Sequence, residues 1–495
     1  MSSTNSSTGS IVWLRQDLRL ADNAAISEAC KNGPVIFVYI LESPPKEKEE
    51  GGEEAEEKGL KAGKASQWWL HHSLTALNIQ LQKFENKLIL RSGNPLSILL
   101  DLVKKTGAKS IFWNRRYEPS LENHDKQIKL ELEKVNIEVN VFSSHLLFEP
   151  ESIKTRMGGP YQVFTPYYNT CIASTGFNLP LPAPKKISAP LNFPISEDLN
   201  DWKLLPKLNW ADNFKTLWKP GSIGGKQLLK IQLAKALPRY SDNRNNPNVD
   251  GTSRIAPYLH FGEIGIRELW HEIENAKRNS SLSSSEIQSL NGYQRQLIWR
   301  EFSYHLMVHF PHSINLPLKE KFNNFPWHTN PRLLKAWQKG QTGYPYIDAG
   351  MRQLWATGWM HNRVRMAVAS FLVKDLLLPW QEGANWFWDT LVDADLANNT
   401  MGWQWVAGCG ADASPYFRIF HPVTQGEKFD PEGDYVRQWV PELSRLEKKW
   451  IQKPWEAPES ALAQAGIVLG KTYPKPIVDH AFARTRALAA YHDLF

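Results

Sequence analysis

The sequence is short of the residues that build cross-linked or membrane-embedded proteins. Only three cysteines occur in 495 residues, and Cys30, Cys171 and Cys409 form no CxxC pair. This excludes a disulfide framework and a cysteine-rich zinc site. No apolar run reaches the roughly 18 residues of a membrane-spanning helix, and the N-terminus lacks the basic and apolar regions of a secretory signal. We expect a cytoplasmic protein with no membrane contact.

Several signature motifs of common enzymes are also missing. No P-loop, no Ser-centred GxSxG, no HExxH and no GxGxxG after the first apolar run is present. Hydrolase, NTPase and dinucleotide-binding hypotheses therefore lack their usual support. No histidine lies at ligand spacing beside Asp393 and Asp395, so we predict no metal site.

Tryptophan and positive charge are what the chain has in excess. It contains 21 tryptophans, 58 Lys plus Arg and 51 Asp plus Glu, for a net charge of +7. Residues 46–58 alone hold three lysines and seven glutamates, so the rest of the chain is more basic than the total indicates. A basic body suggests a polyanionic partner. We interpret the acidic stretch 44–64 as a solvated surface loop.

The chain divides into three stretches of different pattern. Apolar runs at 11–14, 35–41, 88–90, 111–113 and 137–142 alternate with helical patterns, as at 68–84 and 95–105. Strands separated by helices indicate a parallel sheet covered on both faces. We predict an α/β, Rossmann-like domain at 1–145, a Pro- and Asn-rich connector at 146–225 and an all-helical domain at 226–495.

Three local patterns could carry chemistry. Thr252 and Ser253 follow an Asp-Gly turn, where they would cap a helix or hold a phosphate. One helical period places Trp359, Asn362, Arg363 and Met366 on a single face, which would line a pocket or pack in a core. One of the two acids Asp393 and Asp395 is expected to pair with an arginine, Arg363 or Arg365.

Long segments then resemble the photolyase/cryptochrome family over nearly the whole chain. They include VWLRQDLRLADN, DGTSRIAPYLHFGE, LIWREF, TGYPYIDAGMRQLWATGWMHNRVRM, DADLANN and WQWVAGCGADASPYFRIFHP, in the family's order. The resemblance implies an antenna domain joined by a linker to a helical FAD domain, in agreement with the pattern of the three stretches.

The resemblance also assigns a cofactor site. FAD would be held by Tyr240, Thr252, Ser253, Arg254, Ile255, Ala256, Arg365, Asp393, Asp395 and Asn399. Asn399 would face the flavin N5 atom, and Arg365 and Asp393 would form an ion pair beside the ring. Trp403, Trp380 and Trp327 match a tryptophan relay that passes electrons to the flavin. A second chromophore is expected, methenyltetrahydrofolate rather than a deazaflavin.

The same resemblance implies that UV-damaged DNA with pyrimidine dimers is the partner of a monomeric enzyme, a deoxyribodipyrimidine photo-lyase. The dimer pocket would be formed by Gln296, Trp299, Asn362, Met366 and Trp405, and DNA would meet Arg244, Arg363, Trp299 and Trp405. Asn362 and Met366 resemble the residues of cyclobutane pyrimidine dimer (CPD) photolyases, whereas (6-4) lyases have histidines in this segment. Gln296 stands where CPD photolyases usually have Glu. A blue-light-sensing cryptochrome and a (6-4) photolyase remain the alternatives.

Overall fold

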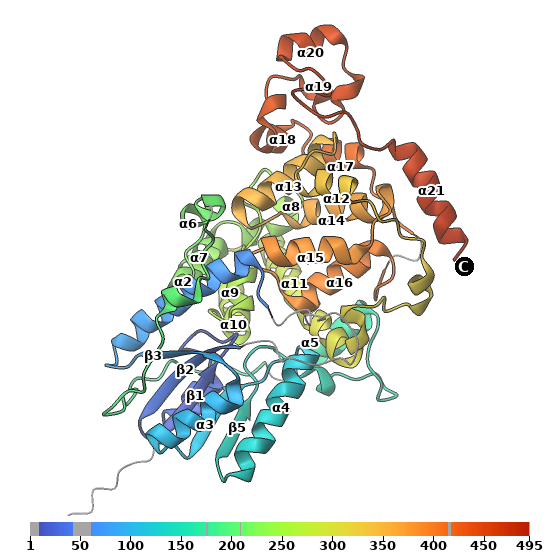
Figure 1. The fold of residues 1–495 in the computed structure, drawn as a ribbon. Coiled ribbons are helices and arrows are strands. Elements are labelled where there is room, and N and C mark those ends of the chain that lie inside the picture. The colour runs from blue at the N-terminus through green and yellow to red at the C-terminus, as the bar shows by residue number, and fades with distance from the viewer. Residues whose placement is uncertain (1–8, 43–60, 175–176, 208, 414–416, 495) are drawn as a thin grey trace, which may run out of the picture.

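The computed structural model describes residues 9–42, 61–174, 177–207, 209–413 and 417–494. Most of the acidic stretch 44–64 lies outside the described residues. An α/β part occupies the lower half of Figure 1 and a larger helical part lies above it. Within the described residues no helix is long and apolar enough to cross a membrane.

The α/β part is built on a five-stranded parallel sheet with the order β3-β2-β1-β4-β5. The strands are β1 (Ser10–Leu14), β2 (Val35–Glu42), β3 (Leu88–Gly93), β4 (Ser110–Asn114) and β5 (Glu138–Phe142). β1 and β4 are buried along their whole length, as expected of central strands covered on both faces. This sheet confirms the predicted fold class.

Four helices connect the strands: α1 (Ala24–Ala29), α2 (Lys64–Gln82), α3 (Pro95–Thr106) and α4 (Pro119–Lys134). Asn23 and Asn94 begin two of them, since each side chain accepts a hydrogen bond from a backbone N–H three residues on. α2 contacts α15 (Trp380–Thr390) of the helical part. Trp68 and Trp69 of α2 are buried, so this helix anchors one part to the other.

The predicted connector is held along the α/β part by backbone hydrogen bonds. Val35 N–H donates to the Ser188 carbonyl over 2.9 Å, and Glu197 N–H donates to the Leu90 carbonyl over 2.9 Å. The stretch contains the helices α5 (Phe164–Ala173) and α6 (Phe214–Leu217), and α7 (Ser222–Ala234) begins at its end. The exact boundaries 1–145, 146–225 and 226–495 stay a prediction.

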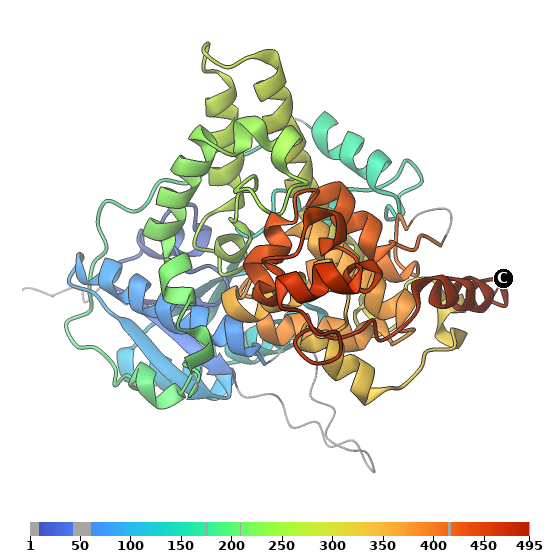
Figure 2. The same cartoon turned by 90° about the horizontal axis from the view of Figure 1, so that it is seen from above.

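The rest of the described chain is helical. No strand follows β5 in the part that the structure describes, and Leu469 and Tyr473 form only an isolated bridge there. Figure 2 shows the C-terminal helix α21 projecting from the side of this part. The helices are α8 (Tyr240–Asn243), α9 (Ala256–His260), α10 (Ile266–Lys277), α11 (Ser284–His309), α12 (Pro331–Gln338), α13 (Pro345–Thr357), α14 (Asn362–Ser370), α15 (Trp380–Thr390), α16 (Leu396–Ala407), α17 (Pro422–Phe429), α18 (Asp434–Trp439), α19 (Lys448–Ile451), α20 (Glu459–Ala465) and α21 (His480–His492).

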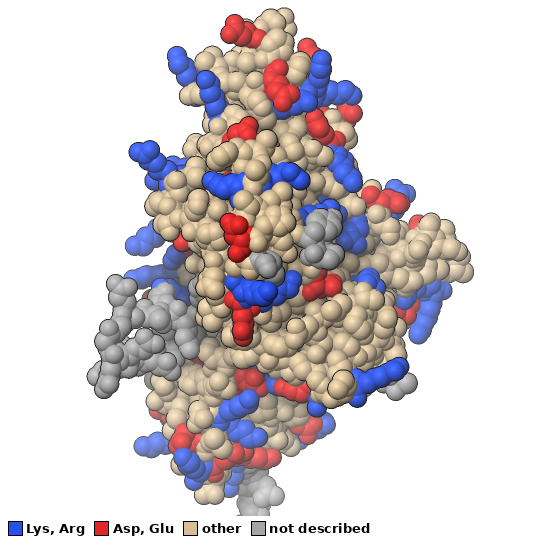
Figure 3. Space-filling model, turned by 90° about the vertical axis from the view of Figure 1, so that its right-hand side faces the viewer, with Lys and Arg blue, Asp and Glu red and all other residues tan. Residues whose placement is uncertain are grey.

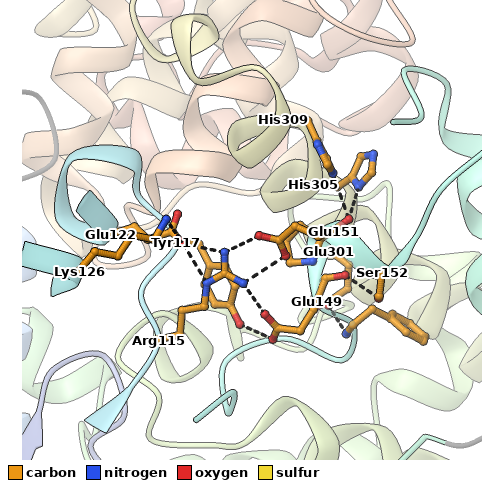
Figure 4. Close-up of polar contacts among 12 residues, drawn as sticks. Arg115, Tyr117, Glu122, Lys126, Glu149, Glu151, Ser152, Glu301, His305 and His309 are labelled. Carbon is orange, nitrogen blue, oxygen red and sulfur yellow. Dashed lines mark hydrogen bonds and ion pairs between the residues drawn. The ribbon is translucent and has the colours of Figure 1, made fainter. Parts of the chain in front are cut away.

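A polar clasp fixes α11 against the α/β part (Figure 4). Arg115, which follows β4, pairs with Glu122 of α4 over 2.7 Å and with Glu149 of the connector over 2.7 Å. On the other side of the connector, Glu301 of α11 accepts hydrogen bonds from the Leu147 and Phe148 N–H groups. The connector is therefore held between the two parts, and α11 is held with it.

Arg19 makes a second, fully buried link between the parts. Its guanidinium donates to the Asp22 and Ser144 carbonyls and, over 2.8 Å, to the Gly262 carbonyl of the helical part. Because Arg19 is only 2% exposed, no water can replace these hydrogen bonds without opening the interface.

We expect Arg19→Met to lower the free energy of unfolding by about 3 kcal/mol, because three buried carbonyls lose a charged donor. Urea unfolding followed by tryptophan fluorescence measures the loss. The exposed Arg484→Met is the control and should change stability by less than about 0.5 kcal/mol. Equal stability of the two variants would contradict the role of Arg19.

Candidate functional site

A cavity of about 330 Å³ lies in the helical part, between α9, α11, α14 and the start of α16. Its lining brings together predicted residues that are up to 155 positions apart in the chain. They are Tyr240, Thr252, Ser253, Arg254, Ile255, Ala256, Gln296, Asn362, Arg365, Asp393 and Asp395. The lining also includes Leu259, His260, Tyr293, Leu297, Arg300, Trp359, Met360 and Asn398, which the sequence analysis did not assign to this site.

Hydroxyl groups and an arginine gather at one end of the cavity. The Tyr293 hydroxyl donates to Ser253 Oγ over 2.9 Å, and Ser253 Oγ accepts from the Ile255 N–H. The helix that follows is capped by Ile255, so the prediction of a Thr or Ser cap is wrong. Arg254 instead adopts a left-handed backbone (φ 53°), a conformation that is uncommon outside functional or turn positions.

A charged pair lies among the lining residues contributed by α14 and the segment before α16. Arg365 donates two hydrogen bonds to Asp393, over 2.8 and 3.1 Å, and a third to the Met360 carbonyl. Of the two arginines considered for Asp393, Arg365 makes the pair, whereas Arg363 donates to Asn245. Both hydrogen bonds to Asp393 come from one nitrogen, Nη2, and Nε makes the bond to Met360, so the guanidinium is held from two sides.

The helix that carries Arg365 is shorter than the sequence pattern suggested. α14 begins at Asn362 and is preceded by its cap, His361. Trp359 therefore lies before the helix, and the expected face of Trp359, Asn362, Arg363 and Met366 is only partly formed. Gly358 ends α13 with a left-handed backbone and turns the chain between the two helices.

Asp395 forms the floor of the cavity with a buried hydrogen-bond network. It caps α16 through the Asn398 N–H and accepts from the Tyr304 hydroxyl over 2.5 Å. Burial by itself raises the pKa of Asp395. The hydrogen bond and the charge of His260 lower it by a larger amount, so the net shift is downward. Arg300 lies in the same network and donates to the ring of His145 over 2.6 Å.

No sequence motif marks this network as one unit, because its members come from four separate segments. The spacing of Arg300 and Tyr304 on α11 is the one local signal, since positions i and i+4 share a helix face. Their common direction becomes meaningful only when Asp395 and His145 are packed against them.

The predicted tryptophan relay lies in one hydrophobic core. Trp403 of α16 and Trp380 of α15 are buried, and Trp327 is half-buried at the edge of the same cluster. Asn399 lines a second cavity with Trp380 and donates to the Ala384 carbonyl over 3.0 Å. The structure thus places Asn399 next to the relay and outside the lining of the first cavity.

The remaining predicted residues lie outside the cavity lining and are half-buried. Trp299 stacks on Phe164, and the Trp405 indole donates to the Asp412 carbonyl. Met366 Sδ lies 4.0 Å from the Asn362 side chain. The Arg244 guanidinium lies 5.0 Å from the centre of the Tyr240 ring.

The lining fits a large nucleotide cofactor with a polar ring. Hydroxyls beside Arg254 suit phosphate oxygens, and the Arg365–Asp393 pair offers both a donor and an acceptor to a heterocycle. The nearby Trp359 ring lies 5.0 Å from the Arg254 guanidinium. FAD contains both chemical groups, so these residues can hold it.

Comparison with known proteins identifies the family. The model for the FAD binding domain of DNA photolyase matches residues 293–493, and the model for DNA photolyase matches residues 10–185. A deoxyribodipyrimidine photo-lyase of Agrobacterium fabrum is 48% identical over 97% of both chains. The chain belongs to the photolyase/cryptochrome family, as predicted.

Two further relatives frame this assignment. Cryptochrome-1 of Arabidopsis thaliana is 40% identical over 96% of this chain and 69% of its own length. The crystal structure of a bacterial class III photolyase from Agrobacterium tumefaciens superposes with a TM-score of 0.92 at 47% identity, covering 100% of this chain and 99% of that one. The similarity to photo-lyases over the full length confirms the predicted enzyme class, and the FAD-binding domain confirms the predicted flavin.

Gly383 allows the relay helices to approach each other. A Cβ added at Gly383 of α15 would lie 2.0 Å from the indole of Trp403. We expect Gly383→Ala to displace that ring and to cost about 2 kcal/mol in unfolding free energy. Chemical denaturation measures the cost.

Gly402→Ala is the matched control, because Gly402 lies on α16 beside Trp403 and an added Cβ meets nothing within 4 Å. Alanine there should stabilise the helix by up to about 1 kcal/mol. If both variants were equally stable, the close approach would not constrain Trp403.

His361 gives the site a predicted pH dependence. It is buried, and its Nδ1 accepts from the Arg363 N–H at the start of α14. Burial first, and then the charge of nearby arginines, lowers the pKa of His361 to about 4. A depressed pKa stabilises the folded state above the ordinary histidine pKa, and this stability is lost as the pH falls toward 4.

His361→Asn retains a helix cap without a titrating group. Between pH 7 and pH 5 the unchanged protein should lose about 2 kcal/mol more stability than this variant. Urea unfolding at the two pH values tests this, with the exposed His312→Asn as the control. A variant that loses as much stability as the unchanged protein would contradict the assignment.

Proposed function

We propose that the protein repairs cyclobutane pyrimidine dimers in DNA in a light-dependent reaction, with FAD bound in the cavity. The observation that supports this proposal most directly is the lining of the cavity. It contains the residues predicted to bind FAD together with Gln296 and Asn362, which are predicted to contact the dimer. FAD, when bound and reduced, would supply on excitation the electron that opens the cyclobutane ring, and the electron would return to the flavin afterwards. Ring opening strictly needs no general acid, in keeping with the absence of hydrolytic motifs from the sequence.

The residues of the chain then have separate tasks. Tyr240, Thr252, Ser253 and Arg254 hold the phosphates, while the Arg365–Asp393 pair orients the ring. Ile255, Ala256 and Asp395 complete the cavity. Asn399 lines the neighbouring cavity with Trp380, and we propose that the flavin N5 is reached from that side. Trp403, Trp380 and Trp327 form the electron relay from the surface, and methenyltetrahydrofolate is the second chromophore.

The dimer is held next to the flavin by aromatic and polar side chains. Trp299 and Trp405 provide flat surfaces for the extruded bases, and Asn362, Met366 and Gln296 contact their polar edges. Extruding a damaged pair costs less unstacking energy than extruding an intact one, which favours damaged DNA. Arg244 and Arg363 meet the phosphates around the lesion.

The surface charge supports a nucleic-acid partner. Figure 3 shows Lys and Arg side chains over the whole height of one face, with Asp and Glu between them. Phosphate contacts release counterions, so affinity for DNA should fall as salt rises. We propose a cytoplasmic monomer with the domains 1–145, 146–225 and 226–495.

A repair assay tests the function directly. The protein with reduced flavin is mixed with an oligonucleotide carrying one thymine cyclobutane dimer, in blue light and in the dark. We expect thymine to be restored in blue light and not in the dark. No restoration with flavin bound and reduced would favour a cryptochrome-type sensor, and repair of a (6-4) oligonucleotide instead would favour a (6-4) lyase.

Gln296 offers a test within the same assay. Glu in its place can form a stronger, proton-stabilised hydrogen bond to a base carbonyl than an amide can. We expect Gln296→Glu to raise the repair yield per photon about two-fold. Gln288→Glu on the same helix, at an exposed position outside the cavity lining, is the control. Equal or lower yield from Gln296→Glu would contradict this role.

A further inference from the structure

The aromatic residue Trp299 is backed by a side chain of the connector. Phe164, the first residue of α5, is stacked on Trp299 with ring centres 3.6 Å apart and planes 11° apart. Phe164 is buried, and Trp299 is half-buried. One face of the indole is therefore covered by Phe164, so the indole can offer only its other face to a ligand.

Arg295 adds a charged group to the same contact. Its guanidinium lies 4.9 Å from the centre of the Phe164 ring and 4.4 Å from that of Tyr168, one turn further along α5. Arg295 precedes Trp299 by four positions on α11, so both side chains point toward α5. A cation over two aromatic faces strengthens the contact between the two helices.

Asp412 connects this contact to the second aromatic residue. Its carbonyl accepts a hydrogen bond from the Trp405 indole over 3.1 Å. Its carboxylate interacts with Arg295 and with the Phe164 N–H; burial raises the pKa of Asp412, and these two groups act against the rise. Asp412 also has a left-handed backbone, with φ 51°. This conformation costs conformational energy, and such strain persists where the surrounding contacts hold a residue in place.

We infer that Phe164, Arg295 and Asp412 form a bracket that positions Trp299 and Trp405 relative to each other. The two tryptophans are 106 positions apart and come from different helices, α11 and α16. Through the bracket, the connector and the loop after α16 set the separation of two aromatic faces that must fit one lesion. The role of the bracket in lesion binding rests on the proposed function. The contacts that form the bracket are present in the protein without DNA.

Positioning of this kind affects selectivity more than general DNA binding. Two aromatic walls at a set separation and angle favour a dimer of one shape, because stacking weakens steeply when the rings tilt or move apart. Contacts to phosphates do not depend on that separation. Loss of the bracket should therefore lower the affinity for dimer DNA and leave the affinity for intact DNA unchanged.

A spectroscopic experiment tests the bracket without any ligand. The FAD-loaded protein is labelled with 5-fluorotryptophan, and the ¹⁹F signals of Trp299 and Trp405 are assigned with Trp299→Phe and Trp405→Phe. Phe164→Leu should move both signals. Tyr168→Leu is the control for loss of a ring from α5. Tyr168 shares Arg295 with Phe164, but within the described residues no ring contact joins it to Trp299, so it should move both signals much less than Phe164→Leu does.

Asp412→Asn provides a second variant. The side chain at this position is exposed, and Asn tolerates a left-handed backbone. The substitution removes the charge toward Arg295, and it should also move both signals. If Phe164→Leu does not fold, this variant alone decides the question. Movement of the Trp299 signal without the Trp405 signal, or movement of neither, overturns the bracket.

DNA-binding measurements then test whether the bracket contributes to selectivity for dimer DNA. In Phe164→Leu the affinity ratio of dimer to intact oligonucleotide should fall about ten-fold, the size of one aromatic stacking contact, and in Tyr168→Leu it should not change. Equal ratios in both variants overturn the role in selectivity. If the unchanged protein does not distinguish the two oligonucleotides, the proposed function fails, while the ¹⁹F result still decides the bracket.

Discussion

The rest of the site depends on the hydrogen bonds and the ion pair made by the buried carboxylate of Asp395. It begins α16, accepts the Tyr304 hydroxyl of α11 and faces His260 of α9. A buried charge is stable only when its partners are all in place, so these three helices can pack together in essentially one arrangement. Arg300 extends the network to His145, just before the connector. The cavity therefore keeps its shape through a polar network to which three of its own lining residues belong, Asp395, His260 and Arg300.

The two parts of the chain are joined by links of the same kind. Arg19 is buried against carbonyls of both parts, and Arg115 and Glu301 hold the connector from opposite sides. The connector is thus a structural layer between the α/β part and α11. This explains how a residue of the connector, Phe164, comes to contact Trp299 of α11. A change at this layer would reach Trp299 without touching the Arg365–Asp393 pair.

Much of the fold could be predicted from local pattern. Short apolar runs predicted all five strands. The central strands β1 and β4 are continuous apolar runs because they are buried on both faces and lose the alternation of exposed strands, whereas the edge strand β5 is partly exposed. Helix ends were less predictable: Trp359 falls outside α14, and Ile255 rather than Thr252 or Ser253 caps α9. Both errors arise at Gly358 and Arg254, where a left-handed residue turns the chain. Such turns follow from tertiary contacts more than from a helical period.

The sequence by itself determined the family, the α/β and helical parts, and most of the residues around the cavity, because long motifs and burial patterns are local properties of the chain. Only the tertiary structure decided which arginine pairs with Asp393, where Asn399 lies, and which residues support the aromatic walls. These depend on distances between segments far apart in the chain, as between Phe164, Trp299 and Asp412. No spacing along one segment records such a distance, since it is set by the packing of several helices at once.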